Sequence, residues 1–233
     1  MTPSIDHRPS LADRSLTSGY REVGALRREF AAKEQPIRER LSEFRRIGEG
    51  TDRELFPELC FCLLAIQTKA RSSDDAVRAL IREGLLWSGN ARSIARSLHH
   101  RVRFHNHKAA YVVAARNRWF SPGGAGFRSA MDVFLNPVET RSWLVDEIEG
   151  LGLKEASHFL RNIGRGEDLA ILDRHVLDNL LRHRVIGRLP TSLTPRRYLK
   201  IEARMRVFAA AVRIPVAALD LLFWSRETGE IFK

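Results

Sequence analysis

The sequence has 233 residues, 44% of them hydrophobic, which is enough to bury a substantial core in one large domain or two interlocked ones. No apolar run reaches the roughly 18 residues that a membrane-spanning helix needs, and the N-terminal residues lack the apolar core of a secretion signal. These features exclude a typical membrane protein and favour a cytoplasmic one. The formal net charge of +11 indicates an acidic partner.

Basic residues gather in two segments of the chain. Residues 69–128 contain twelve Lys or Arg against three Asp or Glu, and residues 182–213 contain nine against one. Such concentrated positive charge favours a polyanion as partner, most simply nucleic acid. A solubilising, arginine-rich surface is the alternative explanation.

Helical spacing of apolar residues dominates the chain, and period-2 alternation is almost absent. Val23–Arg46 is expected to be helical, and the next helix, opened by Pro57, is apolar on nearly every side and should be central. Within it, Cys60 and Cys62 are expected to be buried thiols in a reducing compartment. The fold is therefore predicted to be all-α, with a loose tail up to about Ser18 and a flexible loop at 121–127. Further helices are expected at 73–83, 90–98, 107–118, 140–149, 154–163, 173–183, 195–213 and 215–226.

The stretch Gly150–Leu160, "GLGLKEASHFL", predicts a tight hairpin between two helices, within about residues 140–164. Gly150 and Gly152 permit positive φ and leave the backbone amides uncovered. These amides and the N-terminus of the following helix form a site for a phosphate oxygen, so they can hold a DNA backbone without reading its sequence. A simple glycine-containing connection between two helices would show the same residues.

Lys154 lies on the first turn of the helix that follows this hairpin. The positive end of the helix dipole and partial desolvation there favour the neutral amine, a nucleophile able to attack a sugar carbon and form a Schiff base. About twenty residues later, Asp173 in "LAILDRHVL" is placed to stabilise a developing oxocarbenium charge or to move protons. Asp173 is also expected to cap the helix that begins at Arg174.

These residues resemble the helix-hairpin-helix DNA glycosylase superfamily, and most closely the type 2 8-oxoguanine DNA glycosylases of archaea and some bacteria. The matching pieces extend from Phe56 to the end of the sequence, and the hairpin lysine with its downstream aspartate is the most specific of them. They are "LCFCLLAIQTKA", "VRFHNHKAAYVVAAR", "GLGLKEASHFLRNIG", "LAILDRHVL" and "LLFWSRETGEIFK". The four-cysteine iron–sulfur signature of endonuclease III-like relatives is missing, since two cysteines cannot ligate such a cluster.

The resemblance implies a domain over residues 19–233 made of two interlocked helical subdomains with a cleft between them. It implies a bifunctional DNA repair enzyme that excises 8-oxoguanine and cleaves the strand by β-elimination, with Lys154 as the Schiff-base nucleophile and Asp173 assisting. The lesion nucleotide would be flipped into the cleft, as any enzyme acting on a base in duplex DNA requires. We expect a monomer at the nucleoid, without an organic cofactor, whose hairpin carbonyls hold a monovalent cation that bridges to a DNA phosphate.

The resemblance also assigns residues to the bases of the DNA. Phe104 and Trp224 would sandwich the base, and Lys233, the last residue of the sequence, would help with its terminal carboxylate to recognise 8-oxoguanine, whose protonated N7 is a donor that guanine lacks. Gln67 would fill the gap in the duplex or touch the opposite base, although a helix-end hydrogen bond is equally consistent. From its position next to Asp173, and not from the resemblance, Arg174 is expected to hold a phosphate or to pair with a local acid.

Three other interpretations of the sequence stay open to different degrees. A sibling glycosylase would use the same chemistry on another damaged base. A non-catalytic helix-hairpin-helix DNA-binding protein would need neither Lys154 nor Asp173. A metal-dependent nuclease is disfavoured, because the residues around "HNH" at 105–107 supply no metal-binding context, and no metal site is expected.

Overall fold

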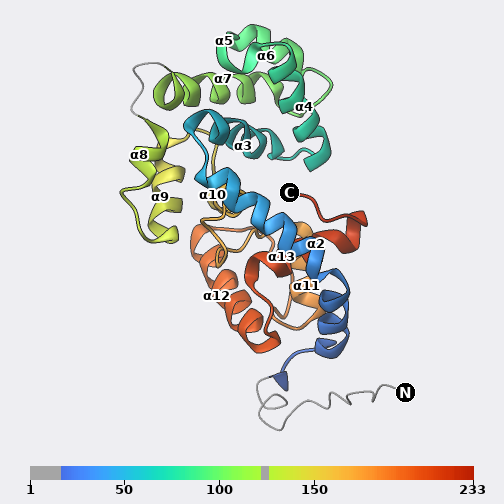
Figure 1. Ribbon diagram of the computed structural model, residues 1–233. Coiled ribbons are helices and arrows are strands. Elements are labelled where there is room, and N and C mark those ends of the chain that lie inside the picture. Colours follow the sequence, from blue (N-terminus) through green and yellow to red (C-terminus); the bar gives the residue numbers. More distant parts are fainter. Residues whose placement is uncertain (1–16, 122–125) are drawn as a thin grey trace, which may run out of the picture.

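The computed structural model describes residues 17–121 and 126–233, which form helices and no strand, so the all-α prediction is confirmed for these residues (Figure 1). The predicted tail lies almost wholly outside the described residues, as does much of the predicted loop at 121–127. The helices are α2 (Val23–Glu49), α3 (Asp52–Ala65), α4 (Ala70–Arg82), α5 (Leu85–Ser88), α6 (Ala91–Leu98), α7 (His105–Ala115), the π-helical η1 (Arg116–Phe120), α8 (Phe127–Met131), α9 (Pro137–Glu147), α10 (Leu153–Asn162), α11 (Arg174–Arg182), α12 (Pro195–Val212) and α13 (Val216–Thr228).

The start of the central helix α3 was predicted wrongly. The helix begins at Asp52, five residues before Pro57, because Thr51 and Glu54 form a capping box that satisfies the first backbone N–H groups. Pro57 then lies in the second turn, inside the helix. The prediction that this helix is central is confirmed, since every residue from Leu55 to Ala65 except Pro57 is buried.

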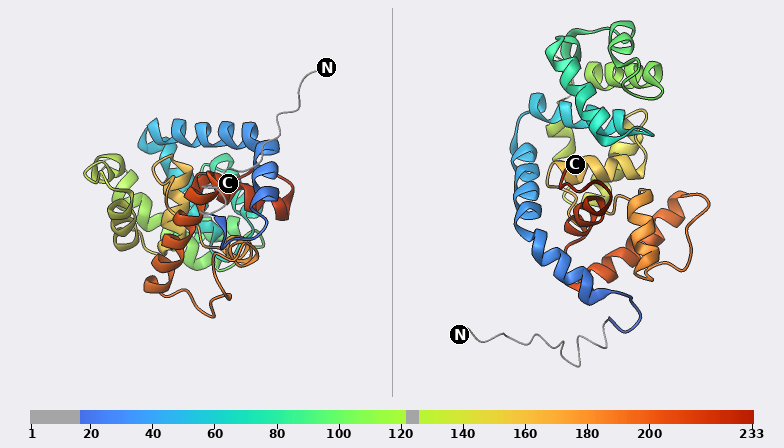
Figure 2. Two further views of the ribbon diagram at one scale, coloured as in Figure 1. Left: turned by 90° about the horizontal axis from the view of Figure 1, so that it is seen from below. Right: turned by 90° about the vertical axis from the view of Figure 1, so that its right-hand side faces the viewer.

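Two hydrophobic clusters form the core. The first is built by residues between Leu55 and Leu169, and the second combines the face of α2 that includes Leu26 with residues from Ala170 onward. Ile47, near the end of α2, packs against both clusters. Figures 1 and 2 accordingly show helices α4–α7 at one end and α11–α13 at the other. The long helix α2 runs past α13 and α10 and leads up to α3, and the C-terminus ends between the two ends.

Helices α9 and α10 form the predicted hairpin, but only one of its glycines needs positive φ. Gly150 has φ +93°, and a Cβ atom there would lie 2.5 Å from the ring of Tyr111, so a side chain fits neither the backbone conformation nor the space. Gly152 is instead the N-terminal cap of α10 with extended backbone angles (φ −102°, ψ −178°) that other residues also adopt. The hairpin therefore depends on glycine at Gly150, where the turn packs against α7.

No single helix in the described ranges is long and apolar enough to cross a bilayer. By length and composition alone, α12 and α13 together would pass such a test, but a bend of 93° separates them.

Candidate active site

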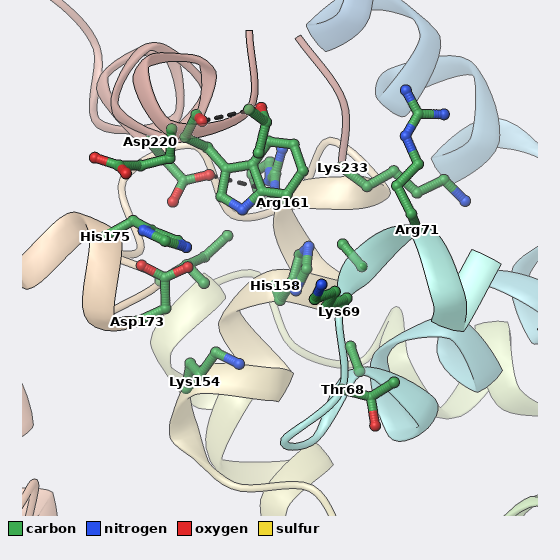
Figure 3. A pocket seen from close by; sticks show the side chains of 16 residues that line it. Thr68, Lys69, Arg71, Lys154, His158, Arg161, Asp173, His175, Asp220 and Lys233 are labelled. Carbon is green, nitrogen blue, oxygen red and sulfur yellow. Dashed lines mark hydrogen bonds and ion pairs between the residues drawn. The ribbon is translucent and has the colours of Figure 1, made fainter. Parts of the chain in front are cut away.

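A cavity of about 480 Å³ lies between the two clusters and is lined by residues of the α3–α4 turn, α10, segment 171–175, α13 and the C-terminus (Figure 3). Its size falls within the ~300–1,000 Å³ of small-molecule sites in proteins. Residues far apart in the sequence therefore meet around one space, and these include four of the predicted site residues: Lys154, Asp173, Trp224 and Lys233.

Lys154 reaches the cavity wall from the first turn of α10. Its side chain is 29% exposed, and its Nζ atom lies 3.3 Å from Oε1 of the neighbouring Glu155. The amine is thus accessible to a ligand in the cavity while one acidic neighbour holds it. The amine lies in the cavity wall and does not project into open solvent. A nucleophilic lysine requires such a position.

Asp173 both caps α11 and lines the cavity. Its Oδ1 atom accepts a hydrogen bond of 2.8 Å from the backbone N–H of Val176, so the predicted capping role is confirmed. Within the part of the chain that the structure describes, Oδ2 accepts no hydrogen bond. The cap fixes the direction of the carboxylate, and the second oxygen stays available to a ligand or a proton.

Arg161 and Asp220 form a buried ion pair in the cavity wall, with Arg161 Nη2 3.3 Å from Asp220 Oδ2. The pKa of Asp220 is raised to about 6, mainly by burial. The charge of Asp173 adds to this rise, while Arg161 and Lys154 oppose it. The Nε and Nη1 atoms of Arg161 are buried and have no hydrogen-bond partner among the residues that the structure describes. Each unsatisfied buried donor costs about 1–3 kcal/mol.

His158 is a second cavity residue with an unsatisfied atom. Its Nε2 has no hydrogen-bond partner in the described ranges, and its ring packs edge-on against Phe61 at 5.4 Å. Burial, followed by the charges of Arg161, Lys154 and Lys233, holds the pKa of His158 well below its usual value. The imidazole is therefore neutral near pH 7.

Lys233 lies in the cavity wall with its ammonium bound to two carboxylates. Nζ is 2.9 Å from Glu58 and 3.1 Å from Asp74, and it lies 4.7 Å from the ring centre of Phe61. Burial alone would lower the pKa of Lys233, but the two carboxylates outweigh it and the pKa is raised. The side chain is thus a fixed cation, and the ring of Trp224 beside it packs against Phe232 at 6.0 Å.

The remaining predicted residues are not among those that line the cavity. Phe104 is 50% exposed and Gln67 is exposed, and both have left-handed backbone conformations with φ of 56° and 51°. The side chain of Arg174 is 91% exposed and lies 3.9 Å from Asp178, the local acid that the sequence had offered as its alternative partner. Gln67 immediately precedes Thr68 and Lys69, which do line the cavity.

Comparison with known proteins identifies the family. The family model described as 8-oxoguanine DNA glycosylase matches residues 37–214. A protein of Fusobacterium nucleatum named 8-oxoguanine DNA glycosylase/AP lyase is 40% identical over 215 residues, which cover 92% of this chain and 97% of that protein. This chain belongs to the 8-oxoguanine DNA glycosylase family.

Solved structures of 8-oxoguanine DNA glycosylases share its fold. The Thermotoga maritima 8-oxoguanine DNA glycosylase matches with a TM-score of 0.80 and 31% identity, over 91% of this chain and 98% of that one. The Methanocaldococcus jannaschii 8-oxoguanine glycosylase/lyase, crystallised with a 15mer DNA containing 8-oxoguanine, matches with a TM-score of 0.77 and 30% identity, over 90% of this chain and 100% of that one. The helix-hairpin-helix architecture inferred from the sequence is confirmed.

Several site residues of this family member escaped prediction from its sequence. Glu58, Arg161 and Asp220 are charged residues embedded in the apolar segments "FPELCFC", "HFLRNIG" and "AALDLLFW". Ionised groups are rarely buried without a partner, so a lone charge within an apolar helix was the available signal. The sequence did not show which of these residues pair with one another or with Lys233.

Proposed function

We propose that this 8-oxoguanine DNA glycosylase family member excises 8-oxoguanine from duplex DNA through a Schiff base at Lys154 and then cleaves the strand by β-elimination. It acts as a monomer on the DNA of the cytoplasmic nucleoid. The observation that carries the proposal is the convergence of the Lys154 amine and the Asp173 carboxylate, from two different helices, on one cavity.

The chemistry assigned to Lys154 and Asp173 follows from their positions. In its neutral form, the amine of Lys154 attacks C1′ of the extruded nucleotide, and the glycosidic bond breaks as its electrons leave with the base. The Asp173 carboxylate stabilises the positive charge that develops on the sugar. The amine then loses a proton, and the C1′–O4′ bond breaks with a proton taken up by O4′, which leaves an iminium between Lys154 and C1′. The iminium acidifies C2′, and loss of a C2′ proton expels the 3′ phosphate.

Recognition of the base is assigned to the cavity wall. Trp224 supplies an aromatic face for stacking, and Lys233, held by Glu58 and Asp74, fixes the shape and charge of the wall beside it. Phe104 would complete the predicted sandwich only if its ring moves toward the cavity when DNA binds. If the ring of Phe104 moves in this way, Phe104→Ala should weaken 8-oxoguanine binding, as Trp224→Ala does. Unchanged binding in Phe104→Ala would leave Trp224 as the stacking residue.

The hairpin is assigned to the DNA backbone, with Gly150 and Gly152 allowing close approach and Arg174 supplying an exposed cation. No hydrogen-bond donor from the described residues occupies the backbone carbonyls of Glu149, Gly150 or Leu151. Free carbonyl oxygens suit a monovalent cation, so the predicted cation between hairpin and phosphate fits these residues. Within the described ranges, no cluster of three or more His, Cys, Asp or Glu side chains forms a metal site.

Borohydride trapping on a duplex with one 8-oxoguanine tests the proposal. The wild-type protein should become covalently attached to the DNA, and Lys154→Gln should lose attachment while keeping its affinity for the lesion duplex. Lys69→Gln is the matched control, because Lys69 also lines the cavity. Undiminished trapping of the Lys154→Gln protein would place the nucleophile elsewhere. A wild-type protein trapped only on other damaged bases would make it a sibling glycosylase, and a protein that is never trapped would be a binding module.

A further inference from the structure

Lys108, near the start of α7, is almost completely buried beneath the turn that joins α3 to α4. Its Nζ donates to the carbonyls of Leu64 and Ile66, both at 2.7 Å, and to Oγ1 of Thr68 at 2.9 Å. A protonated lysine has three N–H donors, so these three acceptors use all of them. The two carbonyls belong to the end of α3, where the negative end of the helix dipole favours a cation.

The turn held by Lys108 forms part of the cavity wall. Thr68 and Lys69 line the cavity, and Gln67 between them and α3 is exposed with φ of 51°. Oγ1 of Thr68 also accepts a hydrogen bond of 3.2 Å from the backbone N–H of Arg103. A left-handed conformation is unfavourable for a residue such as glutamine and persists only where the surroundings enforce it. The contacts of Lys108 and Thr68 supply that enforcement.

The charges around Lys108 make these contacts sensitive to pH. The pKa of Lys108 is lowered to about 8, mainly by burial. The positive charges of Arg103 and Lys154 add to this lowering, while Glu155 opposes it. These three groups lie before α7 and on α10, whereas α3 and the turn contribute the uncharged acceptors described above. Above pH 8 the neutral amine has two N–H donors for three acceptors. It also lacks the positive charge that interacts favourably with the negative end of the α3 dipole.

We propose that Lys108 is a positioning residue for lesion capture, which holds the α3–α4 turn so that Gln67 faces the duplex and Thr68 and Lys69 stay in the cavity wall. Lys108 itself is buried and does not touch the DNA. The inference rests on the proposed function. It adds that the protonation of the Lys108 amine determines how strongly its hydrogen bonds hold the turn. Capture of the lesion therefore weakens as the pH rises past the pKa of Lys108.

A lysine that only supports the fold would show the opposite dependence on pH. The pKa of Lys108 is about 8 in the folded protein and near 10.4 in an unfolded chain. Between these values the unfolded chain binds more protons, so the contribution of Lys108 to the free energy of unfolding rises with pH. Stability and capture are thus expected to change in opposite directions over the same pH range.

The experiment measures binding without chemistry. In a Lys154→Gln background, fluorescence anisotropy gives the affinity for an 8-oxoguanine duplex and for the same undamaged duplex from pH 6.5 to 9.5. Because the charge of Lys154 lowers the pKa of Lys108, the Lys154→Gln replacement shifts the midpoint of the pH dependence to higher pH. Lys108→Met removes the donor, Lys108→Arg keeps a permanent cation, and thermal melts confirm that each variant is folded. Ionisation of the DNA bases affects all variants equally, so differences between the variants come from the protein.

The preference of the parent for the lesion duplex should fall about tenfold between pH 7 and pH 9.5. The preference of the Lys108→Met protein for the lesion duplex should lie about tenfold below that of the parent at pH 7 and should not change with pH. Lys108→Arg should restore part of the preference. A Lys108→Met protein that matches the parent at pH 7, or that keeps the parent's pH dependence, overturns the inference.

A second variant covers the case in which Lys108→Met does not fold. Thr68→Val removes one acceptor while keeping the shape of the side chain, and it should lower the preference about threefold at pH 7. An unchanged preference in Thr68→Val also overturns the inference. Failure of the wild-type protein to be trapped on the lesion duplex would instead overturn the proposed function, so the two results are distinguishable.

Discussion

Replacing Arg141 by Met is expected to destabilise the protein strongly. Arg141 of α9 and Glu202 of α12 are each 1% exposed, and they form a bidentate ion pair with N–O distances of 2.6 and 3.0 Å. Arg141 also donates to Ser157 at 3.0 Å, and the backbone N–H of Ala170 donates to Glu202 at 2.9 Å. Removing one partner of a buried pair costs about 3–5 kcal/mol. At about 2–4 °C per kcal/mol for a chain of this length, the Tm should fall by about 6–20 °C.

Urea and thermal unfolding of four proteins test this reasoning: the wild type, Arg141→Met, the double variant Arg141→Met/Glu202→Met, and Arg182→Met. The double variant should recover most of the loss, because no uncompensated charge stays buried. Arg182 pairs with Glu22 at the surface, with 56% and 43% of the two side chains exposed, so its replacement should cost no more than about 1 kcal/mol. The reasoning is refuted if Arg141→Met lies within about 1 kcal/mol of wild type, or if the double variant is no more stable than the single one.

Four further outcomes are expected. Asp173→Asn should slow single-turnover excision far more than it weakens binding, with stability unchanged within about 0.5 kcal/mol because Asn is an equally good cap; a loss confined to affinity would leave Asp173 as a cap alone. Removal of Lys233 should reduce the excision rate of 8-oxoguanine relative to guanine, and unchanged selectivity would exclude this residue from recognition. Asp220, whose pKa is raised from 3.8 to about 6, should lower the free energy of unfolding by up to about 3 kcal/mol as the pH rises from 4 to 7, since the folded state binds more protons in that window. Asp220→Asn should lack this decline in pH-dependent urea titrations. DNA affinity should decrease steeply with salt because phosphate contacts release counterions, and a flat response would contradict backbone binding.

The features that were predictable from the sequence are those with local causes. Glycine at a tight turn, a capping carboxylate and a lysine on the first helical turn are visible within a few residues, so the hairpin, Lys154 and Asp173 were placed correctly on their elements. The start of α3 was equally local but was assigned to Pro57, and the capping box at Thr51 had the stronger effect because it satisfies two backbone groups at once.

Contacts between distant segments were not predictable in this way. Glu58 binds Asn162, 104 positions later, and Lys233, 175 positions later. Nothing in the residues around Glu58 indicates either partner, because pairing across such separations depends on how the helices pack. For the same reason the structure was needed to show that Phe104 and Gln67 are not among the residues that line the cavity.

The composition of the two hydrophobic clusters has a consequence for synthesis on the ribosome. The buried face of α2, which ends with Phe44, packs against residues from Ala170 onward, so about 126 further residues must be translated before its partners exist. At roughly 5–20 residues per second, this delay is about 6–25 s. The first cluster has all of its members by Leu169. We therefore expect the nascent chain to complete the part that carries Lys154 first, and to become a catalyst only when α13 leaves the exit tunnel and brings Trp224 to the cavity.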